Sequence, residues 1–142
     1  MKLSGIFYIK NIIENKFFIS NSFNIQGKLE YYLTNYMEYN MPLYADMRKY
    51  GLENFLFSII EFCPQYLLNS EYLKWTKLYS KKHSIYPHDM SKKIFILNYK
   101  GKPHIVLKKY ETPLSNLYHY QDRIQWFNSI PIQDIPKECR SG

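Results

Sequence analysis

The segment from Asn54 to Ile60 constrains the fold of this chain more than any other part of its sequence. It reads Asn-Phe-Leu-Phe-Ser-Ile-Ile, is nearly apolar throughout, and stops before Pro64, which cannot continue a β-strand ladder. A strand that is apolar on both sides fits the interior of a sheet, because both of its faces must be covered. The sequence therefore predicts a central β-strand at this position.

Strand and helix patterns precede and follow this segment. β-branched and aromatic residues at 5–10 and 17–20 flank a polar connection, which is the pattern of a β-hairpin. Apolar residues at helical spacing predict helices at 25–36, 42–50 and 67–78. The resulting order, β-β-α-α-β-α, places a small sheet beside several helices and predicts an α+β domain.

The character of the chain changes after this domain. Residues 81–93 are polar and basic and contain Pro87, which predicts a linker. Two apolar runs around a glycine-containing turn then predict a β-hairpin, and residues 113–128 predict a helix. The predicted organisation is a domain over 1–80, the basic linker, and a hairpin, helix and extended tail over 94–142.

The formal net charge of the chain is +7, from 19 Lys and Arg residues against 12 Asp and Glu residues. Such an excess indicates an anionic partner, most often a nucleic acid, because cation contacts to phosphate release bound counterions. A charge of this size also suits plain solubility, and both interpretations stay open. Sixteen of the 19 cations are lysines, which suit contacts to the phosphate backbone better than bidentate reading of bases.

Several cations stand in clusters that alternate with tyrosine, a combination that suits phosphate contacts and base stacking on RNA or single strands. The alternative is an ordinary solvated surface that happens to contain aromatic residues. The candidate nucleic-acid-binding residues are Lys16, Lys28, Arg48, Lys49, Lys81, Lys82, Lys92, Lys93, Lys100, Lys102, Lys108 and Lys109.

Other kinds of site find little support in the sequence. Cys63 and Cys139 stand far apart without metal-ligand spacing, which favours reduced thiols in a protein that is not secreted. The four histidines show no ligand spacing either. No run of about 18 apolar residues is present, so no membrane partner is expected.

The amino-acid usage points to an unusual genome. Phe, Tyr, Met, Ile, Asn and Lys, which have AT-rich codons, supply about half of the chain, while alanine occurs once, at Ala45. Physical chemistry does not require this bias, but a very AT-rich organelle genome would produce it. Since the first residues form neither a signal peptide nor an Arg-rich presequence, we expect translation inside an organelle, the mitochondrion.

Four motifs follow one another within roughly the first 75 residues. They are Gly-Ile-Phe at 5–7, Phe-Ile-Ser at 18–20, a run over 43–59 that contains Lys-Tyr-Gly and Asn-Phe, and Leu-Leu-Asn-Ser-Glu at 67–71. In order and spacing they resemble the GIY-YIG nuclease family, in particular its homing-endonuclease branch. The resemblance implies the fold of that family, a small antiparallel sheet flanked by helices.

The resemblance also implies a chemistry, the hydrolysis of a phosphodiester with one divalent metal ion, Mg²⁺ or Mn²⁺. In the family, tyrosine hydroxyls, a helical arginine and a metal-binding glutamate form the site. In this chain Phe7 and Phe18 stand at the two tyrosine positions, Lys28 stands at or near the arginine, and Ser20 replaces a glycine. Glu71 stands unchanged at the position of the metal-binding glutamate.

These replacements bear on the function. Phenylalanine keeps the ring without the hydroxyl, and lysine keeps the charge without the guanidinium fork. A single carboxylate is a poor metal site. We therefore expect a catalytically inactive nuclease-like protein without a cofactor, in which Phe7, Phe18, Lys28 and Glu71 are remnants of a site.

The expected role is structural binding of nucleic acid, with rRNA and neighbouring proteins of a mitochondrial ribosome as partners. Two alternatives remain open. One is an active metal-dependent homing-type DNA endonuclease that holds Mg²⁺ or Mn²⁺ through Glu71. The other is a protein-interaction module whose basic surface contacts acidic protein.

Overall fold

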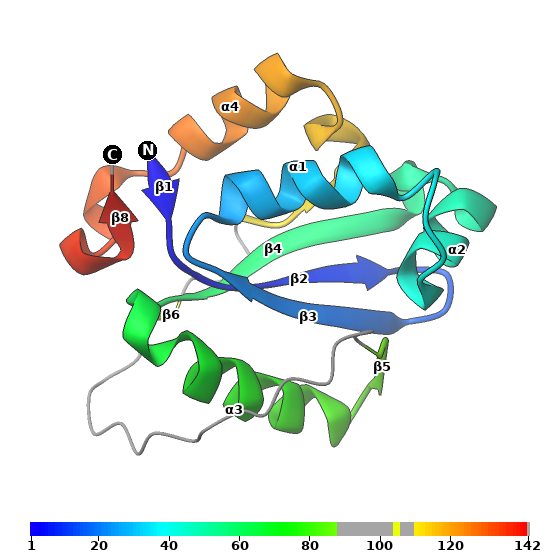
Figure 1. The fold of residues 1–142 in the computed structure, drawn as a ribbon, viewed down its shortest axis with the longest axis horizontal. Coiled ribbons are helices and arrows are strands. Elements are labelled where there is room, and N and C mark those ends of the chain that lie inside the picture. Colours follow the sequence, from blue (N-terminus) through cyan, green and yellow to red (C-terminus); the bar gives the residue numbers. More distant parts are fainter. Residues whose placement is uncertain (88–103, 106–109, 142) are drawn as a thin grey trace.

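The computed structural model describes residues 1–87, 104–105 and 110–141 of the chain. It contains a central sheet with helices on both sides, and short 3₁₀ turns join some of the elements (Figure 1). In chain order they are β1 (Lys2–Leu3), β2 (Gly5–Asn11), β3 (Lys16–Ser22), α1 (Ile25–Asn35), α2 (Pro42–Tyr50), β4 (Phe55–Phe62), α3 (Leu68–Ser80), β5 (Ser84–Ile85), β6 (His104–Ile105), β7 (Thr112–Pro113), α4 (Tyr120–Asn128) and β8 (Arg140–Ser141).

The main sheet has the strand order β5-β3-β2-β4-β6, and β7 also pairs with β4. β2 lies in the middle and pairs antiparallel with both β3 and β4, whereas the short β5 runs parallel to β3. β4 therefore lies inside the sheet, as the apolar segment at 54–60 predicted. The predicted hairpin and the three predicted helices are likewise confirmed as β2–β3, α1, α2 and α3, in an α+β arrangement.

Each face of the sheet carries its own hydrophobic cluster, because successive side chains of a strand point to opposite faces. Helices α1 and α4 lie on one side of the sheet and α3 lies on the other (Figure 1). Phe7, Phe18 and Phe57 belong to the cluster under α1, whereas Ile6, Tyr8 and others pack against α3. We call the two sides the α1 face and the α3 face.

Local sequence explains where several elements begin and end. The side chain of Asn24 accepts a hydrogen bond from the backbone N–H of Gly27 at 3.2 Å and so caps the start of α1. Pro42 occupies the first turn of α2, where its missing N–H is not needed. Gly51 ends α2 with a φ of 86°, a conformation that favours glycine.

The C-terminal part of the chain differs from the predicted division into domain, linker and extension. Leu114, Leu117, Phe127 and Ile135 are buried in the same cluster as Phe7. α4 and a preceding 3₁₀ turn form within the predicted helix at 113–128. Residues 110–141 therefore share one hydrophobic core with the first 80 residues. They cover the part of the α1 face that α1 does not cover.

Two further details depart from the prediction. Ser84–Ile85, inside the predicted linker over 81–93, forms β5 and extends the sheet beside β3. β1 pairs with β8, which places the two ends of the described chain side by side (Figure 1). Of the predicted C-terminal hairpin, only His104–Ile105 lies among the described residues, where it forms β6, and the rest falls outside them.

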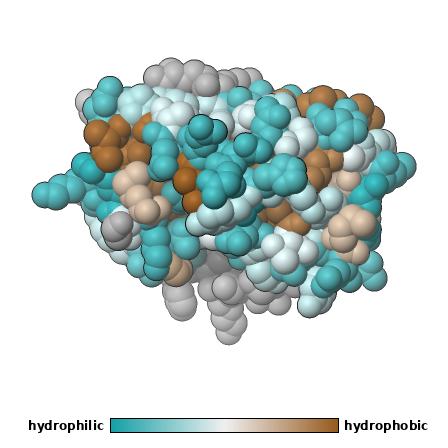
Figure 2. Space-filling model, turned by 90° about the horizontal axis from the view of Figure 1, so that it is seen from above, coloured by the Kyte–Doolittle hydropathy of each residue, from teal (hydrophilic) through white to brown (hydrophobic). Residues whose placement is uncertain are grey.

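The surface over α1 and α4 is mostly hydrophilic, with hydrophobic residues in separate small groups (Figure 2). No helix in the described part of the chain combines the length and apolar character needed to cross a membrane. Cys63 and Cys139 are both buried and both free thiols.

Candidate functional site

Phe7 and Phe18, at the two positions where the resembled family has tyrosine, are core residues of the α1 face. Both side chains are fully buried, at 0% exposure. The ring of Phe7 lies 5.5 Å from that of Phe57, and the ring of Phe18 lies 5.3 Å from that of Tyr32 in an edge-on arrangement. Such centroid distances are typical of packed aromatic pairs. The two rings therefore act as core side chains.

Phe7, Phe18, Phe57 and Tyr32 form an aromatic group on the α1 face. The sequence motifs did not single out Tyr32. Its hydroxyl lies 2.8 Å from that of Ser20, so the two share a hydrogen bond between α1 and β3. Burial raises the pKa of the Tyr32 hydroxyl. The available signal was the helical spacing of Ile25, Leu29 and Tyr32, which places Tyr32 on the buried side of α1.

Lys28, which stands at or near the position of the family's arginine, lies beside these aromatic rings. Its Nζ lies 5.3 Å from the centre of the Tyr31 ring and 5.5 Å from that of Tyr32. A cation at this distance over aromatic rings gains a cation–π attraction. Phe7, Phe18 and Lys28 are thus brought together on the α1 face.

Glu71 lies elsewhere, on α3 at the opposite face of the sheet. It is 5% exposed, and its Oε2 lies 2.5 Å from Nζ of Lys74 on the same helix. The side chain is therefore a buried, ion-paired carboxylate and does not join the aromatic group. The sequence motif does not reveal this separation, because it gives order along the chain and not the face on which a residue lies.

Glu71 has a partner that the sequence analysis missed, Glu61 of β4. The carboxylate of Glu61 is 1% exposed, accepts a hydrogen bond from the Trp75 indole N–H, and lies 3.7 Å from Nζ of Lys74. Burial, followed by the neighbouring Glu71, raises the pKa of Glu61 to about 7. A lone glutamate at the end of an apolar strand was the signal that could have identified it.

A β-bulge in β4 aims Glu61 at α3. Ile6 of β2 pairs with Glu61, while the next residue, Phe7, pairs with Ile59, so Ile60 is an extra residue in β4. A bulge of this kind lets two consecutive side chains face the same way. Ile60 packs in the α3-face cluster, and Glu61 reaches Lys74 and Trp75 from the same side.

The carboxylate pair does not by itself form a metal site. Lys74 contacts both carboxylates, and its ammonium group supplies the positive charge that a metal ion would otherwise bring. No group of three or more His, Cys, Asp or Glu residues suited to a metal ion occurs among the residues that the structure describes. In this arrangement, the residues present do not fit a bound Mg²⁺ or Mn²⁺.

The predicted nucleic-acid-binding cations that the structure describes lie on different elements of the fold. Arg48 donates to the backbone carbonyls of Tyr36 and Tyr39 at 2.5 and 3.0 Å, and so holds the loop between α1 and α2. Lys16 lies 4.5 Å over the Tyr86 ring, and Lys49 lies 5.0 Å over the Tyr50 ring.

The remaining predicted cations fall into two groups. Lys81 and Lys82 are exposed at the C-terminal end of α3. The other six lie outside the described residues, namely Lys92, Lys93, Lys100, Lys102, Lys108 and Lys109.

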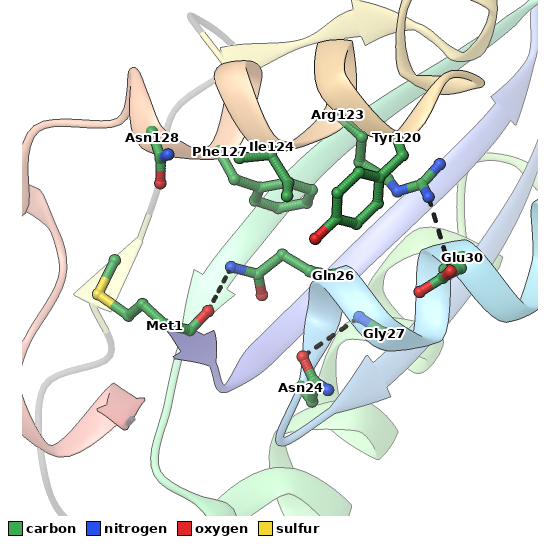
Figure 3. A pocket seen from close by; sticks show the side chains of 10 residues that line it. All are labelled: Met1, Asn24, Gln26, Gly27, Glu30, Tyr120, Arg123, Ile124, Phe127 and Asn128. Carbon is green, nitrogen blue, oxygen red and sulfur yellow. Dashed lines mark hydrogen bonds and ion pairs between the residues drawn. The ribbon is translucent and has the colours of Figure 1, made fainter.

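A pocket of about 330 Å³ lies between the start of α1 and α4 (Figure 3). Tyr120 and Phe127 project into it from α4, and Arg123 points toward Glu30 of α1 at 4.0 Å (Figure 3). Arg123 is only 6% exposed and donates to the carbonyls of Leu117 and Tyr118 at 2.8 and 3.1 Å. This arginine therefore fastens α4 to α1, and its guanidinium already has its partners.

Comparison with known proteins agrees with this architecture. No family model matches the chain, and no curated protein sequence matches it. Among solved structures, the catalytic domain of intron endonuclease I-TevI, in a glutamate-to-alanine variant, matches with a TM-score of 0.52 and 26% sequence identity. The match covers 64% of this chain and 98% of that domain, so about a third of this chain lies outside it.

That domain comes from a GIY-YIG homing endonuclease, and the four motifs at 5–7, 18–20, 43–59 and 67–71 lie on the β2, β3, α2–β4 and α3 regions of the described fold. The order of the elements, the antiparallel pairing of the first three long strands and the match to the I-TevI catalytic domain all agree. This chain has a GIY-YIG-like fold.

Proposed function

We propose that this chain is a nucleic-acid-binding module that does not cleave phosphodiester bonds. The observation that carries the proposal is the full burial of Phe7 and Phe18, which stand where the resembled family has tyrosine. A buried ring without a hydroxyl neither positions water nor takes a proton. Loss of one general base typically costs about 10²- to 10⁴-fold in rate, and loss of several groups of one site leaves little.

The ion pair on the α3 face supports the same proposal. Lys74 neutralises the charge of Glu71 from 2.5 Å, so a metal ion would have to displace this ammonium group. Mg²⁺ also prefers six oxygen ligands in a nearly octahedral arrangement. Glu71 therefore serves the packing of α3 on the sheet in this proposal.

Binding of nucleic acid is supported by charge and by the kind of fold. The net charge of +7 attracts phosphate, and the GIY-YIG-like fold is shared with a catalytic domain of an endonuclease. Phosphate contacts need cations and do not need the tyrosine hydroxyls. A domain with this fold can therefore still bind nucleic acid after it has lost the residues needed for phosphodiester cleavage.

Within this proposal, the finer assignment is to structured RNA, with rRNA of a mitochondrial ribosome as the partner. Its support is the sequence, since lysine beside tyrosine suits RNA and the codon bias suits an organelle genome. Native purification followed by sequencing of the bound nucleic acid tests this assignment. Recovery of rRNA is expected, and recovery of DNA alone would overturn the RNA assignment while leaving nucleic-acid binding intact.

The binding test is a salt titration of the full chain against structured RNA and duplex DNA. Affinity is expected to fall steeply as salt rises, because phosphate contacts release counterions. Absence of binding at low salt, where the attraction is greatest, would instead support the protein-interaction alternative.

A metal-dependent endonuclease is the second candidate, because a metal ion that displaced Lys74 would find two adjacent buried carboxylates, Glu61 and Glu71. Incubation of the chain with plasmid DNA and Mg²⁺ or Mn²⁺ separates the two functions. We expect no nicking above background. Cleavage that Glu71→Ala abolishes, and that the exposed-surface control Glu38→Ala retains, would overturn the proposal of an inactive module.

A further inference from the structure

A second pocket, of about 420 Å³, opens on the α3 face beside the C-terminal half of α3. Its lining comes from β2, β3, α3 with the turn that follows it, and Glu111, so the fold assembles it from distant parts of the chain. The volume lies within the range of ordinary ligand sites. The lining of this pocket includes none of Phe7, Phe18, Lys28 and Glu71, the positions that the nuclease resemblance identifies.

Aromatic rings form the walls of this pocket. The ring centres of Phe17 and His83 lie 4.7 Å apart, and those of Phe17 and Tyr79 lie 5.0 Å apart. The planes of these pairs are inclined by 50° and 57°, so the rings do not stack fully on one another. Tyr79, His83 and Trp75 are only partly buried, which leaves ring surface open to a flat ligand.

Two lysines add positive charge to the pocket lining. Nζ of Lys10 lies 5.3 Å from the centre of the Phe17 ring, and Lys82 is exposed in the turn that follows α3. Both residues line the pocket, and Lys81 is the neighbour of Lys82 in the chain. Aromatic surface with lysine beside it is the pattern by which proteins hold single-stranded nucleic acid, stacking bases and pairing phosphates.

The pocket also contains polar groups that have capacity to bind a base edge. Glu111 accepts a hydrogen bond from the Tyr8 hydroxyl, and a carboxylate offers about four acceptor positions, so further donors can be accommodated. Nδ1 of His83 is buried and has no hydrogen-bond partner among the described residues, so it does not face the open pocket. Recognition of a base edge therefore depends on Glu111.

We propose that this pocket binds an unpaired nucleobase of a nucleic-acid strand and that Glu111 selects guanine. The inference rests on the proposed nucleic-acid binding and specifies the site and the base. Guanine presents N1–H and N2–H₂ side by side, which suit the two oxygens of a carboxylate. Adenine and cytosine each offer an amino group, whereas uracil offers a single N3–H between two carbonyl oxygens that repel a carboxylate, and is the poorest match.

The test is fluorescence anisotropy of labelled five-nucleotide strands, one of uracil alone and others with guanine, adenine or cytosine at the centre, in RNA and DNA versions. The full chain is expected to bind the guanine strand about tenfold more tightly than the uracil strand, as one bidentate contact provides. Glu111→Gln, which keeps an acceptor for Tyr8, should remove this preference, so that the guanine and uracil strands bind with similar affinity.

Lys82→Gln has a matched control in Lys137→Gln, because both lysines are exposed and lie outside helices α1 to α4. Lys82→Gln should lower affinity for all strands and reduce the salt slope by about one, whereas Lys137→Gln should leave both unchanged. The RNA and DNA versions distinguish the source of the guanine. Melting temperatures of the variants show whether each one is folded.

Two results would overturn the inference, and they differ from each other. Salt-dependent binding without any base preference, unaffected by Glu111→Gln and Lys82→Gln, would remove the pocket from the binding surface and leave the proposed function standing. Absence of binding to every strand and to structured RNA at low salt would remove the proposed function as well.

Discussion

The hydroxyl groups of Ser20 and Tyr32 lie 2.8 Å apart and share a hydrogen bond inside the core. Both side chains are buried, and the bond joins β3 to α1 next to the ring of Phe18. Where the resembled motif has a glycine, this chain thus has a serine whose polar group is satisfied by a helix residue outside the motif. Packing and this polar contact both help to hold together the aromatic group on the α1 face.

Replacement of Tyr32 by phenylalanine is expected to destabilise the fold by about 1–3 kcal/mol, because the Ser20 hydroxyl is left buried without its partner. Urea denaturation measures the change. A double-mutant cycle with Ser20→Ala should give a coupling free energy on the order of 1 kcal/mol. Strictly additive effects would show that the two hydroxyls do not interact.

Replacing Phe7 and Phe18 by the family's tyrosines should lower the free energy of unfolding without producing nuclease activity. In Phe7→Tyr and Phe18→Tyr, each new hydroxyl enters a fully packed core, and we expect a loss of about 1–3 kcal/mol for each. A plasmid nicking assay with Mg²⁺ is expected to stay at background for the double variant. Nicking that depends on Glu71 would contradict the interpretation of these rings as core residues.

The raised pKa of Glu61 makes stability depend on pH. Since the folded-state pKa is about 7 and the usual glutamate value is 4.5, the folded state binds more protons than the unfolded state between these limits. Stability from this group is therefore greatest at low pH and falls as pH rises through this window. The fall between pH 5 and pH 7 should be about 2 kcal/mol.

Glu61→Gln isolates this effect, because glutamine does not titrate and its carbonyl can still accept from Trp75. The difference in unfolding free energy between wild type and Glu61→Gln should shrink toward acid pH, where the carboxyl of Glu61 is protonated. A difference that is constant from pH 5 to pH 8 would show that Glu61 titrates normally.

Lys74 is expected to stabilise the carboxylate pair at neutral and alkaline pH. Lys74→Gln leaves Glu61 and Glu71 without their shared cation and should cost about 1–2 kcal/mol at pH 8, a value discounted because Lys74 is partly exposed. The cost should be smaller at pH 5, where Glu61 is protonated. Lys77→Gln, an exposed lysine on the same helix, is the matched control and should change stability little.

The C-terminal segment is expected to be part of the folding unit. Phe127→Ala removes a buried ring that contacts Phe57 at 5.9 Å, and should cost about 3–5 kcal/mol. A chain ending at residue 87 should fail to unfold cooperatively, because the α1 face loses its cover. A sharp two-state transition of that shortened chain would contradict the shared core.

Elements with a local pattern were predictable from the sequence. The apolar run that became β4, the hairpin of β2 and β3, and the three helices at 25–36, 42–50 and 67–78 all follow from side-chain periodicity and turn residues. These depend on neighbours within a few positions, which is the range over which periodicity and capping act. The motifs at 5–7 and 18–20 likewise led to the GIY-YIG-like fold that the solved structure supports.

The tertiary structure decided which residues meet. The sequence grouped Glu71 with Phe7 and Phe18, but the alternation of side chains along β2 and β3 and the position of α3 place them on opposite faces. Glu61 joined Glu71 only because a bulge in β4 turned it toward α3. Both arrangements depend on contacts between residues that are far apart in the sequence, so no local sequence pattern predicts them.

The same reason explains the ends of the chain. The pairing of Lys2 with Ser141 and the burial of Phe127 beside Phe57 join residues that are far apart in sequence. Such contacts form because the α1 face has apolar area that α1 alone leaves uncovered, and burial of that area stabilises whichever segment fits over it. The sequence predicted a C-terminal helix at 113–128, and only the tertiary packing determined that this helix covers the α1 face.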